Sequence, residues 1–98
     1  MELDKLVHQP TRLRIFAHLY ATGETSFTEL TEELEITEGN LATHIERMED
    51  ADCVAVDKEF VDRKPRTSYR LTERGEELFE DHIETLEALI DGLETDDA

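Results

Sequence analysis

The sequence contains one cysteine, no tryptophan, and only 10 basic residues against 26 acidic ones in a chain of 98 residues. The single thiol, Cys53, excludes an internal disulfide and any metal site built from several cysteines. No apolar run approaches the roughly 18 residues that a membrane-spanning helix needs. Glu2 and Asp4 stand where a secretory signal would be basic. We therefore expect a soluble, cytoplasmic protein with no membrane partner.

Catalytic patterns are also missing from the chain. There is no glycine-rich phosphate loop, no nucleophile beside a base, and no carboxylate pair that stands out from the acidic background. The four histidines are too far apart in the sequence to repeat the spacing of a zinc site: His8, His18, His44 and His82. We expect no enzymatic activity, no metal and no cofactor.

The net charge of −16 at first argues against nucleic acid as a partner, because duplex DNA repels an acidic surface. However, the many carboxylates, with three lysines beside seven arginines, resemble proteins from salt-accumulating halophiles, typically archaeal ones. In molar salt the Debye length is roughly 3 Å, so the local distribution of charge matters more than the sum. Residues 58–70 hold half of all the basic residues and carry a net charge of +3. A function in binding explains this cluster, and a solvated hairpin with random charge is the alternative.

Apolar spacing and capping residues predict four main helices after a short one near residues 3–8, over about 10–23, 26–36, 38–51 and 72–93. Pro10 suits a first helical turn, Gly23 a helix end, and Ser26, Thr37 and Thr72 are N-cap candidates. Between residues 53 and 71 the period changes to two, which predicts two strands joined by a basic turn at residues 62–66. We expect Pro65 to lie in that turn, because proline cannot serve in the centre of a ladder.

The third of these helices, residues 38–51, has two different faces. Its apolar positions point to a core: Leu41, Ile45 and Met48. The opposite stripe is polar and mostly uncharged in a chain rich in acids: Asn40, Thr43, His44 and Arg47. Two helices joined by a tight turn, the second with a polar outer face, and a hairpin after them make a winged helix-turn-helix. The expected fold class is mainly α with a small β-hairpin (α+β), in which residues 1–72 form the winged helix-turn-helix and residues 73–98 a long C-terminal helix and acidic tail.

Several runs in this order resemble winged-helix transcriptional regulators related to the MarR and ArsR repressors, in their short single-domain form. The runs are residues 8–15, 37–41, 44–49, 60–72 and 73–75. The resemblance implies a homodimer that binds double-stranded operator DNA, with helix 38–51 in the major groove and the hairpin, or wing, on the backbone or minor groove. It also implies that residues 1–72 are the DNA-binding domain and residues 73–98 a C-terminal dimerisation helix and acidic tail. The DNA contacts it implies are Gly39, Asn40, Thr43, His44, Arg47, Arg63, Lys64 and Arg66. An apolar stripe on the last helix is the expected dimer contact, although a surface for another partner is the alternative: Leu78, Phe79, Ile83, Leu86, Leu89, Ile90 and Leu93.

Alternatives stay open at several positions. Arg47 could pair with Glu46 or Asp50 on its own helix, and the rest of its stripe could be solvated surface. Glu38 could lie near phosphates or accept from a cytosine amino group. Cys53 is expected to be a buried apolar residue, with a redox switch as the alternative.

A different function class also remains. The fold could serve as a protein-interaction module whose acidic surface mimics DNA or docks a basic partner. The wing cations favour DNA, because a mimic would gain from losing Arg63, Lys64 and Arg66. A small-molecule effector is compatible with a regulator, but the sequence supplies no support for one.

Overall fold

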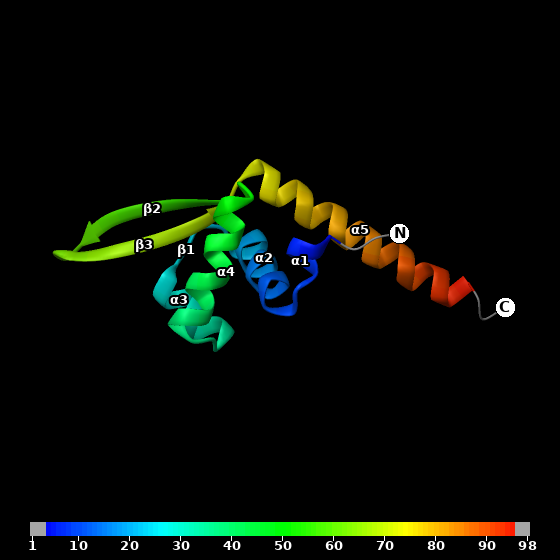
Figure 1. Ribbon diagram of the computed structural model, residues 1–98, viewed down its shortest axis with the longest axis horizontal. Helices are drawn as coiled ribbons and strands as arrows, with labels where there is room; N and C mark the ends of the chain where they lie inside the picture. The colour runs from blue at the N-terminus through cyan, green and yellow to red at the C-terminus, as the bar shows by residue number, and fades with distance from the viewer. Residues whose placement is uncertain (1–3, 96–98) are drawn as a thin grey trace.

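A computed structural model describes residues 4–95 of the chain. The elements follow in the order α1 (Lys5–His8), α2 (Pro10–Thr22), β1 (Thr25–Ser26), α3 (Phe27–Leu34), α4 (Glu38–Asp50), β2 (Val54–Val61), β3 (Lys64–Leu71) and α5 (Glu73–Thr95). The body of helices α1–α4 lies between two projections, the β2–β3 hairpin on one side and the far half of α5 on the other (Figure 1). This arrangement makes the molecule elongated, at 62 × 25 × 21 Å.

The predicted helix starts are confirmed by hydrogen bonds that satisfy free backbone N–H groups. The Ser26 hydroxyl accepts from the Glu29 N–H at 3.1 Å, and Thr37 accepts from the Asn40 N–H at 3.2 Å. The Thr72 hydroxyl accepts from the Gly75 N–H at 3.1 Å, so it caps α5 as expected. Pro10 occupies the first turn of α2, where its missing N–H leaves no partner unsatisfied.

The turn between α3 and α4 fixes the angle between these two helices. Glu35 adopts a left-handed backbone with φ of 53° directly after Leu34, the last residue of α3. The Arg14 guanidinium donates to the Leu34 carbonyl from α2, which satisfies one of the carbonyls left free at a helix end. Helix α4 then begins two residues after Ile36, which is half-buried against the core.

The sheet has three antiparallel strands in the order β1-β3-β2, whereas the sequence predicted only the β2–β3 hairpin. Strand β1 consists of Thr25 and Ser26, which pair with Tyr69 and Ser68. A strand of this length carries too few residues to show a period of two. It nevertheless anchors the inner end of β3 to the start of α3.

Pro65 lies in strand β3, opposite Phe60, and the turn is confined to Asp62 and Arg63. The prediction that Pro65 belongs to the turn is therefore wrong. Antiparallel ladders alternate hydrogen-bonded and non-bonded pairs. Strand β1 pairs only with Ser68 and Tyr69 at the inner end of β3, so the edge of β3 beside Pro65 is open. A residue without an N–H can thus occupy this position beside an open edge without breaking a ladder bond.

The core lies where helices α1–α4, the inner sheet and the start of α5 meet. The inner face of α4 is fully enclosed, with Leu41 at 0%, Ile45 at 2% and Met48 at 0% exposure. Phe79 of α5 stacks on Phe16 of α2 with ring centroids 6.3 Å apart. The first turns of α5 therefore belong to the same core as the helix-turn-helix.

The apolar stripe of α5 divides into two parts along the helix. Phe79 is buried, and Leu78 and Ile83 pack partly buried against the core. Beyond them Leu89, Ile90 and Leu93 are exposed by 41%, 54% and 72% as the helix runs past the body (Figure 1). None of the helices within residues 4–95 is long and apolar enough to cross a membrane. The chain ends counted in the expected ranges 1–72 and 73–98, residues 1–3 and 96–98, lie outside the described residues.

We predict that Gly75→Ala destabilises the fold by about 1–3 kcal/mol, because the added Cβ would overlap the backbone carbonyl of Cys53. Gly92→Ala on the same helix is the matched control, since nothing lies within 4 Å of its added Cβ. The free energy of unfolding of that control should rise by up to about 1 kcal/mol, because alanine has a better helix propensity than glycine. Urea unfolding of the three proteins measures both effects. Equal stability of Gly75→Ala and the natural chain would contradict the close packing of α5 on Cys53.

Candidate nucleic-acid interface

The outer face of α4 presents the polar stripe that the sequence predicted. Burial of the inner face turns Asn40, Thr43 and Arg47 outward, and all three are exposed. The Thr43 hydroxyl donates to the Gly39 carbonyl one turn earlier at 3.0 Å, so its oxygen is left to accept. Gly39 lies in the first turn of α4, and a Cβ added there would meet open space.

His44 differs from the rest of the stripe because it is half-buried and has a partner from another helix. Its Nδ1 lies 3.2 Å from Nη1 of Arg12, which the first turn of α2 places beneath α4. Burial lowers the pKa of His44, and the positive charges of Arg12 and Arg47 lower it further. His44 is therefore neutral near pH 7.

Arg12, His44 and Arg47 form a basic cluster across α2 and α4. Arg12 is only 8% exposed, and burial followed by the charge of Arg47 lowers its pKa. Within residues 4–95 Arg47 makes no ion pair with Glu46 or Asp50, the alternative that the sequence left open. The cluster thus concentrates positive charge at one point of a strongly acidic chain.

The hairpin tip (residues 61–64) carries two exposed cations. Asp62 and Arg63 form the turn, with φ of 51° and 67°, so both lie in the left-handed region. Such a pair of positive φ angles is typical of the tight hairpin turns that match the twist of antiparallel strands. The side chains of Arg63 and Lys64 therefore project from the end of the hairpin into solvent.

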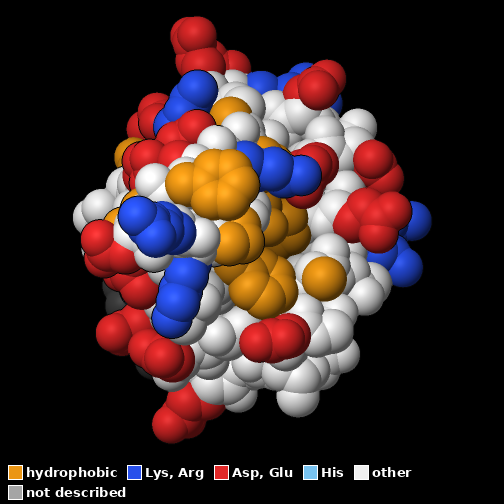
Figure 2. All heavy atoms as spheres, turned by 90° about the vertical axis from the view of Figure 1, so that its left-hand side faces the viewer, with side chains coloured by type: hydrophobic (Ala, Val, Ile, Leu, Met, Phe, Trp, Pro, Cys, Tyr) orange, Lys and Arg blue, Asp and Glu red, His pale blue; other side chains and the backbone are white. Residues whose placement is uncertain are grey.

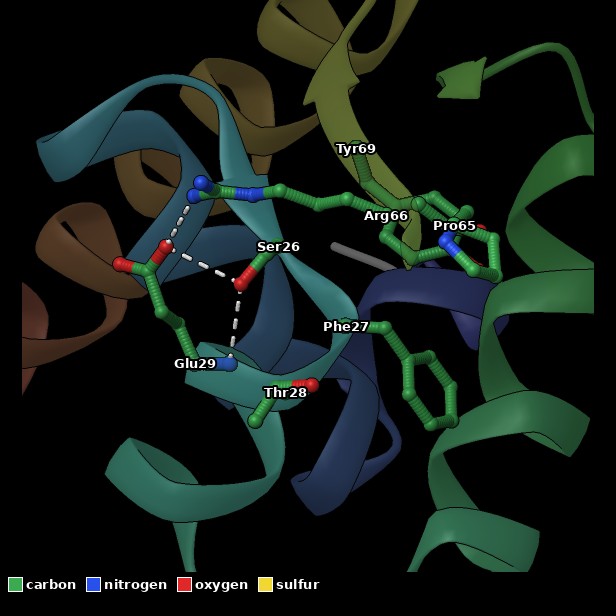
Figure 3. Close-up of a pocket in the computed structure, with 8 residues that line it drawn as sticks. Ser26, Phe27, Thr28, Glu29, Pro65, Arg66 and Tyr69 are labelled. Atoms are coloured by element: carbon green, nitrogen blue, oxygen red, sulfur yellow. Dashed lines mark hydrogen bonds and ion pairs between the residues drawn. The ribbon is translucent and has the colours of Figure 1, made fainter. Parts of the chain in front are cut away.

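Arg66, the third predicted wing cation, is held by helix α3. Its Nη2 lies 2.9 Å from Oε1 of Glu29, and the same carboxylate oxygen accepts from the Ser26 hydroxyl at 3.0 Å (Figure 3). The two side chains are about half exposed, at 46% and 53%. The ion pair joins the hairpin to the start of α3 across an open hollow of about 670 Å³ that Phe27 and Tyr69 also line.

Apolar side chains gather on the end of the molecule that carries the hairpin, with Lys and Arg side chains at their margin (Figure 2). The inward face of strand β2 becomes exposed along its length, from Val54 at 6% through Val56 at 37% to Phe60 at 79%. The alternation of apolar and polar residues in β2 predicted an apolar face. Only the first part of that face packs on the core, because the strand extends beyond the body of the domain. Phe60 is thus an exposed aromatic ring beside the basic hairpin tip.

The groups that suggested other chemistry are explained by packing. Cys53 is fully buried, and burial raises the pKa of its thiol, so it is held as a protonated core residue. In the part of the chain that the structure describes, no three metal-ligating side chains come together. A second hollow, of about 390 Å³, lies between α2 and α5 and is lined by Tyr20, Phe79 and Ile83 together with acidic residues.

Three residues of this surface received no role from the sequence: Arg12, Glu29 and Phe60. Arg12 belongs to the run 8–15 that carried the resemblance, but helical spacing alone does not show that its side chain reaches α4. Glu29 lies three residues after the N-cap candidate Ser26, but its bond to Arg66 joins residues 37 apart, so no local pattern predicts it.

Comparison with known proteins agrees with this geometry. A family model described as a winged helix DNA-binding domain matches residues 11–90. The chain belongs to this family. A transcriptional regulator homologue from Pyrococcus horikoshii is 34% identical, with 90% of this chain and 87% of that chain covered and a TM-score of 0.85.

Two further relatives extend the comparison of this winged-helix chain. MarR shares the fold at 20% identity, with a TM-score of 0.77 over 93% of this chain and 66% of that one. An uncharacterised protein from Methanocaldococcus jannaschii is 29% identical over 79 residues, which is 81% of this chain and 86% of the relative. Family and fold point to a DNA-binding transcription regulator and not to an enzyme.

We predict that Arg63→Gly stabilises the winged-helix domain by up to about 1 kcal/mol, because glycine adopts a positive φ without the steric cost that arginine bears. Lys64→Gly is the matched control, since it removes the same charge from a strand position where glycine costs about 0.5–1 kcal/mol. Thermal unfolding followed by circular dichroism compares the two variants. A lower melting temperature for Arg63→Gly than for the natural chain would contradict the turn geometry.

Proposed function

We propose that the protein is a sequence-specific regulator that binds double-stranded DNA as a homodimer. Helix α4 enters the major groove, and the wing contacts the backbone or minor groove. The observation that carries this proposal is the location of the cations. The basic cluster of α2 and α4 and the hairpin tip gather cations on two neighbouring parts of the fold in a chain whose net charge is −16.

The side chains of α4 match the edges of base pairs in the major groove. Asn40 can pair with adenine and Arg47 with guanine, while Thr43 can accept from an exocyclic amino group. Gly39 leaves the start of α4 open, so that a phosphate can approach the free N–H groups there. Glu38, exposed beside it, is the residue of α4 that opposes this approach.

The wing residues are suited to phosphates to different degrees. Arg63 and Lys64 are exposed at the hairpin tip and can contact DNA without rearrangement. Arg66 must exchange its Glu29 partner for a phosphate, and the cost is small because exposed ion pairs contribute about 0–1 kcal/mol. We therefore expect Arg63 and Lys64 to contribute more to DNA affinity than Arg66.

The interaction-module alternative also has an observation in its favour. Phe60 is 79% exposed, and Val56 on the same face of β2 is 37% exposed. Exposed apolar surface of this kind is common at protein interfaces. A docking module of this kind would bind its partner through this ring and would not need Lys64. The effect of the wing cations on DNA binding therefore separates the two functions.

We predict that fluorescence anisotropy with the DNA upstream of the gene, in about 2 M KCl, shows saturable binding that a non-specific duplex does not match. Arg63→Ala/Lys64→Ala/Arg66→Ala should weaken this binding by at least about tenfold, because phosphate contacts are lost. Asn40→Ala should reduce the preference for the upstream DNA more than it reduces overall affinity.

Lys64→Ala and Lys5→Ala provide the matched comparison, because each removes one exposed lysine and Lys5 lies in α1, away from the wing (Figure 1). Only Lys64→Ala should weaken binding. A KCl series tests the salt adaptation: cations held between carboxylates and phosphates should make the slope of log K against log[salt] shallow or positive. A steep negative slope would contradict the adaptation, and equal loss in both lysine variants would contradict the wing contact.

The second half of the apolar stripe of α5 is the proposed dimer contact. Phe79 and Ile83 are largely used within the chain's own core, so the contact depends mainly on Leu86, Leu89, Ile90 and Leu93. A dimer whose subunits share a two-fold axis places two copies of α4 on successive major grooves, which a single domain of this size cannot do.

We predict that Leu86→Asp/Leu89→Asp gives monomers in size-exclusion chromatography with light scattering, because two charges would be buried in the seam. Phe60→Asp is the control, since it places a charge on exposed apolar surface at the opposite end of the molecule and should leave a dimer. A dimer that persists in the α5 variant would refute this seam.

A further inference from the structure

The guanidinium of Arg12 connects the first residues of α1 to the middle of α4. Its Nε donates to the Leu6 carbonyl at 2.7 Å, and its Nη2 reaches the Lys5 carbonyl at 3.5 Å. Its Nη1 lies 3.2 Å from Nδ1 of His44. Each of the three nitrogens therefore has a partner, and the side chain is held at 8% exposure.

The contact with His44 determines where the imidazole proton resides. A guanidinium has only N–H donors and cannot accept a hydrogen bond. Nδ1 of His44 must therefore offer its lone pair to Arg12. A neutral imidazole carries one proton, so that proton is on Nε2.

We propose that Arg12 is a positioning residue that holds His44 in the Nε2–H form, so that α4 presents a hydrogen-bond donor to an acceptor on a base edge. The acceptors in the major groove are purine N7, guanine O6 and thymine O4, and we assign the His44 donor to a purine N7. A cytosine amino group does not fit, because it is itself a donor. This inference rests on the proposed entry of α4 into the major groove.

The charges around His44 favour the same form. Arg12 faces the ring from α2, and Arg47 acts on it from its own helix. A proton added at Nδ1 would point at the Arg12 guanidinium, and both cations oppose it. Burial lowers the pKa of His44 as well, so the Nε2–H donor persists at neutral pH.

His82 shows what the Arg12 contact adds. It is also buried, at 2% exposure, and its nearest ring neighbour is His8 at 6.0 Å between centroids. Neither ring nitrogen of His82 has a hydrogen-bond partner among the described residues. No hydrogen bond there selects one tautomer, so His82 and the half-buried His18 serve as internal references for His44.

The first experiment measures the tautomer directly, without DNA. Long-range ¹H–¹⁵N correlation spectra of the ¹⁵N-labelled protein near pH 7.5 should show His44 as the Nε2–H form with an accepting Nδ1. In Arg12→Met this preference should be lost, and the pKa of His44 should rise because a neighbouring cation is gone. Arg12→Lys keeps the positive charge and should keep the lowered pKa of His44. It therefore separates the effect of the charge from the effect of the planar guanidinium donors. An Nδ1–H form, or an even mixture in the natural chain, would overturn the assignment.

The second experiment tests contact with a base. In the upstream duplex, each purine N7 is replaced by C–H in turn, and the affinity for each duplex is measured by anisotropy. Replacement at one position should weaken binding of the natural protein about three- to tenfold, as expected for the loss of one hydrogen bond. The same replacement should not change the affinity of His44→Leu. His44→Gln should restore the sensitivity, because its amide can accept from Arg12 and donate onward.

The outcomes separate the inference from the function on which it rests. If His44→Leu weakens binding to all duplexes equally and no N7 position responds, the assigned contact between His44 and a purine N7 is overturned. If the natural protein binds no duplex, the proposed function fails together with base contact, while the tautomer spectrum still decides the role of Arg12 separately.

Discussion

The burial of one side of α4 is the constraint on which the rest of the structure depends. Leu41, Ile45 and Met48 are almost completely removed from solvent, and truncating any such residue costs about 2–5 kcal/mol of a total stability of about 5–15 kcal/mol. The helix therefore has one stable rotation about its axis. Because that rotation is fixed, Asn40, Thr43 and Arg47 must face outward. The left-handed Glu35 and the Thr37 cap then set where along its axis the helix begins.

Electrostatics explains how a chain this acidic can present a surface for DNA. Helix α5 carries nine acidic residues and one arginine, and it runs from the base of the hairpin towards the opposite end of the molecule (Figure 1). The cations are held in positions that cost free energy: Arg12 is buried, and Arg63 adopts a left-handed backbone. Charged groups kept in such positions are common at functional sites, where stability is offset by other parts of the fold. The separation of charge along the molecule thus matters more than its sum.

The sequence predicted the features that depend on nearby residues, and it missed those that depend on distant ones. The caps at Ser26, Thr37 and Thr72 follow from local chemistry, as does the apolar period of α4, and the structure confirms them. Strand β1 is too short to produce a period, and the strand position of Pro65 depends on how far β1 extends along β3. The contact between Arg12 and His44 joins residues 32 apart, so no local pattern reveals it. The proposed contacts of the site residues with DNA remain predictions.

Backbone NMR tests most directly whether α4 and the wing form one DNA-contacting surface. Adding the upstream duplex to ¹⁵N-labelled protein in high salt should shift amide signals of residues 39–47 and 61–66 and leave the exposed far half of α5 unchanged. Arg12 should also shift through its contact with His44. Shifts concentrated on α5, or absent from α4, would contradict this account of how the protein binds DNA.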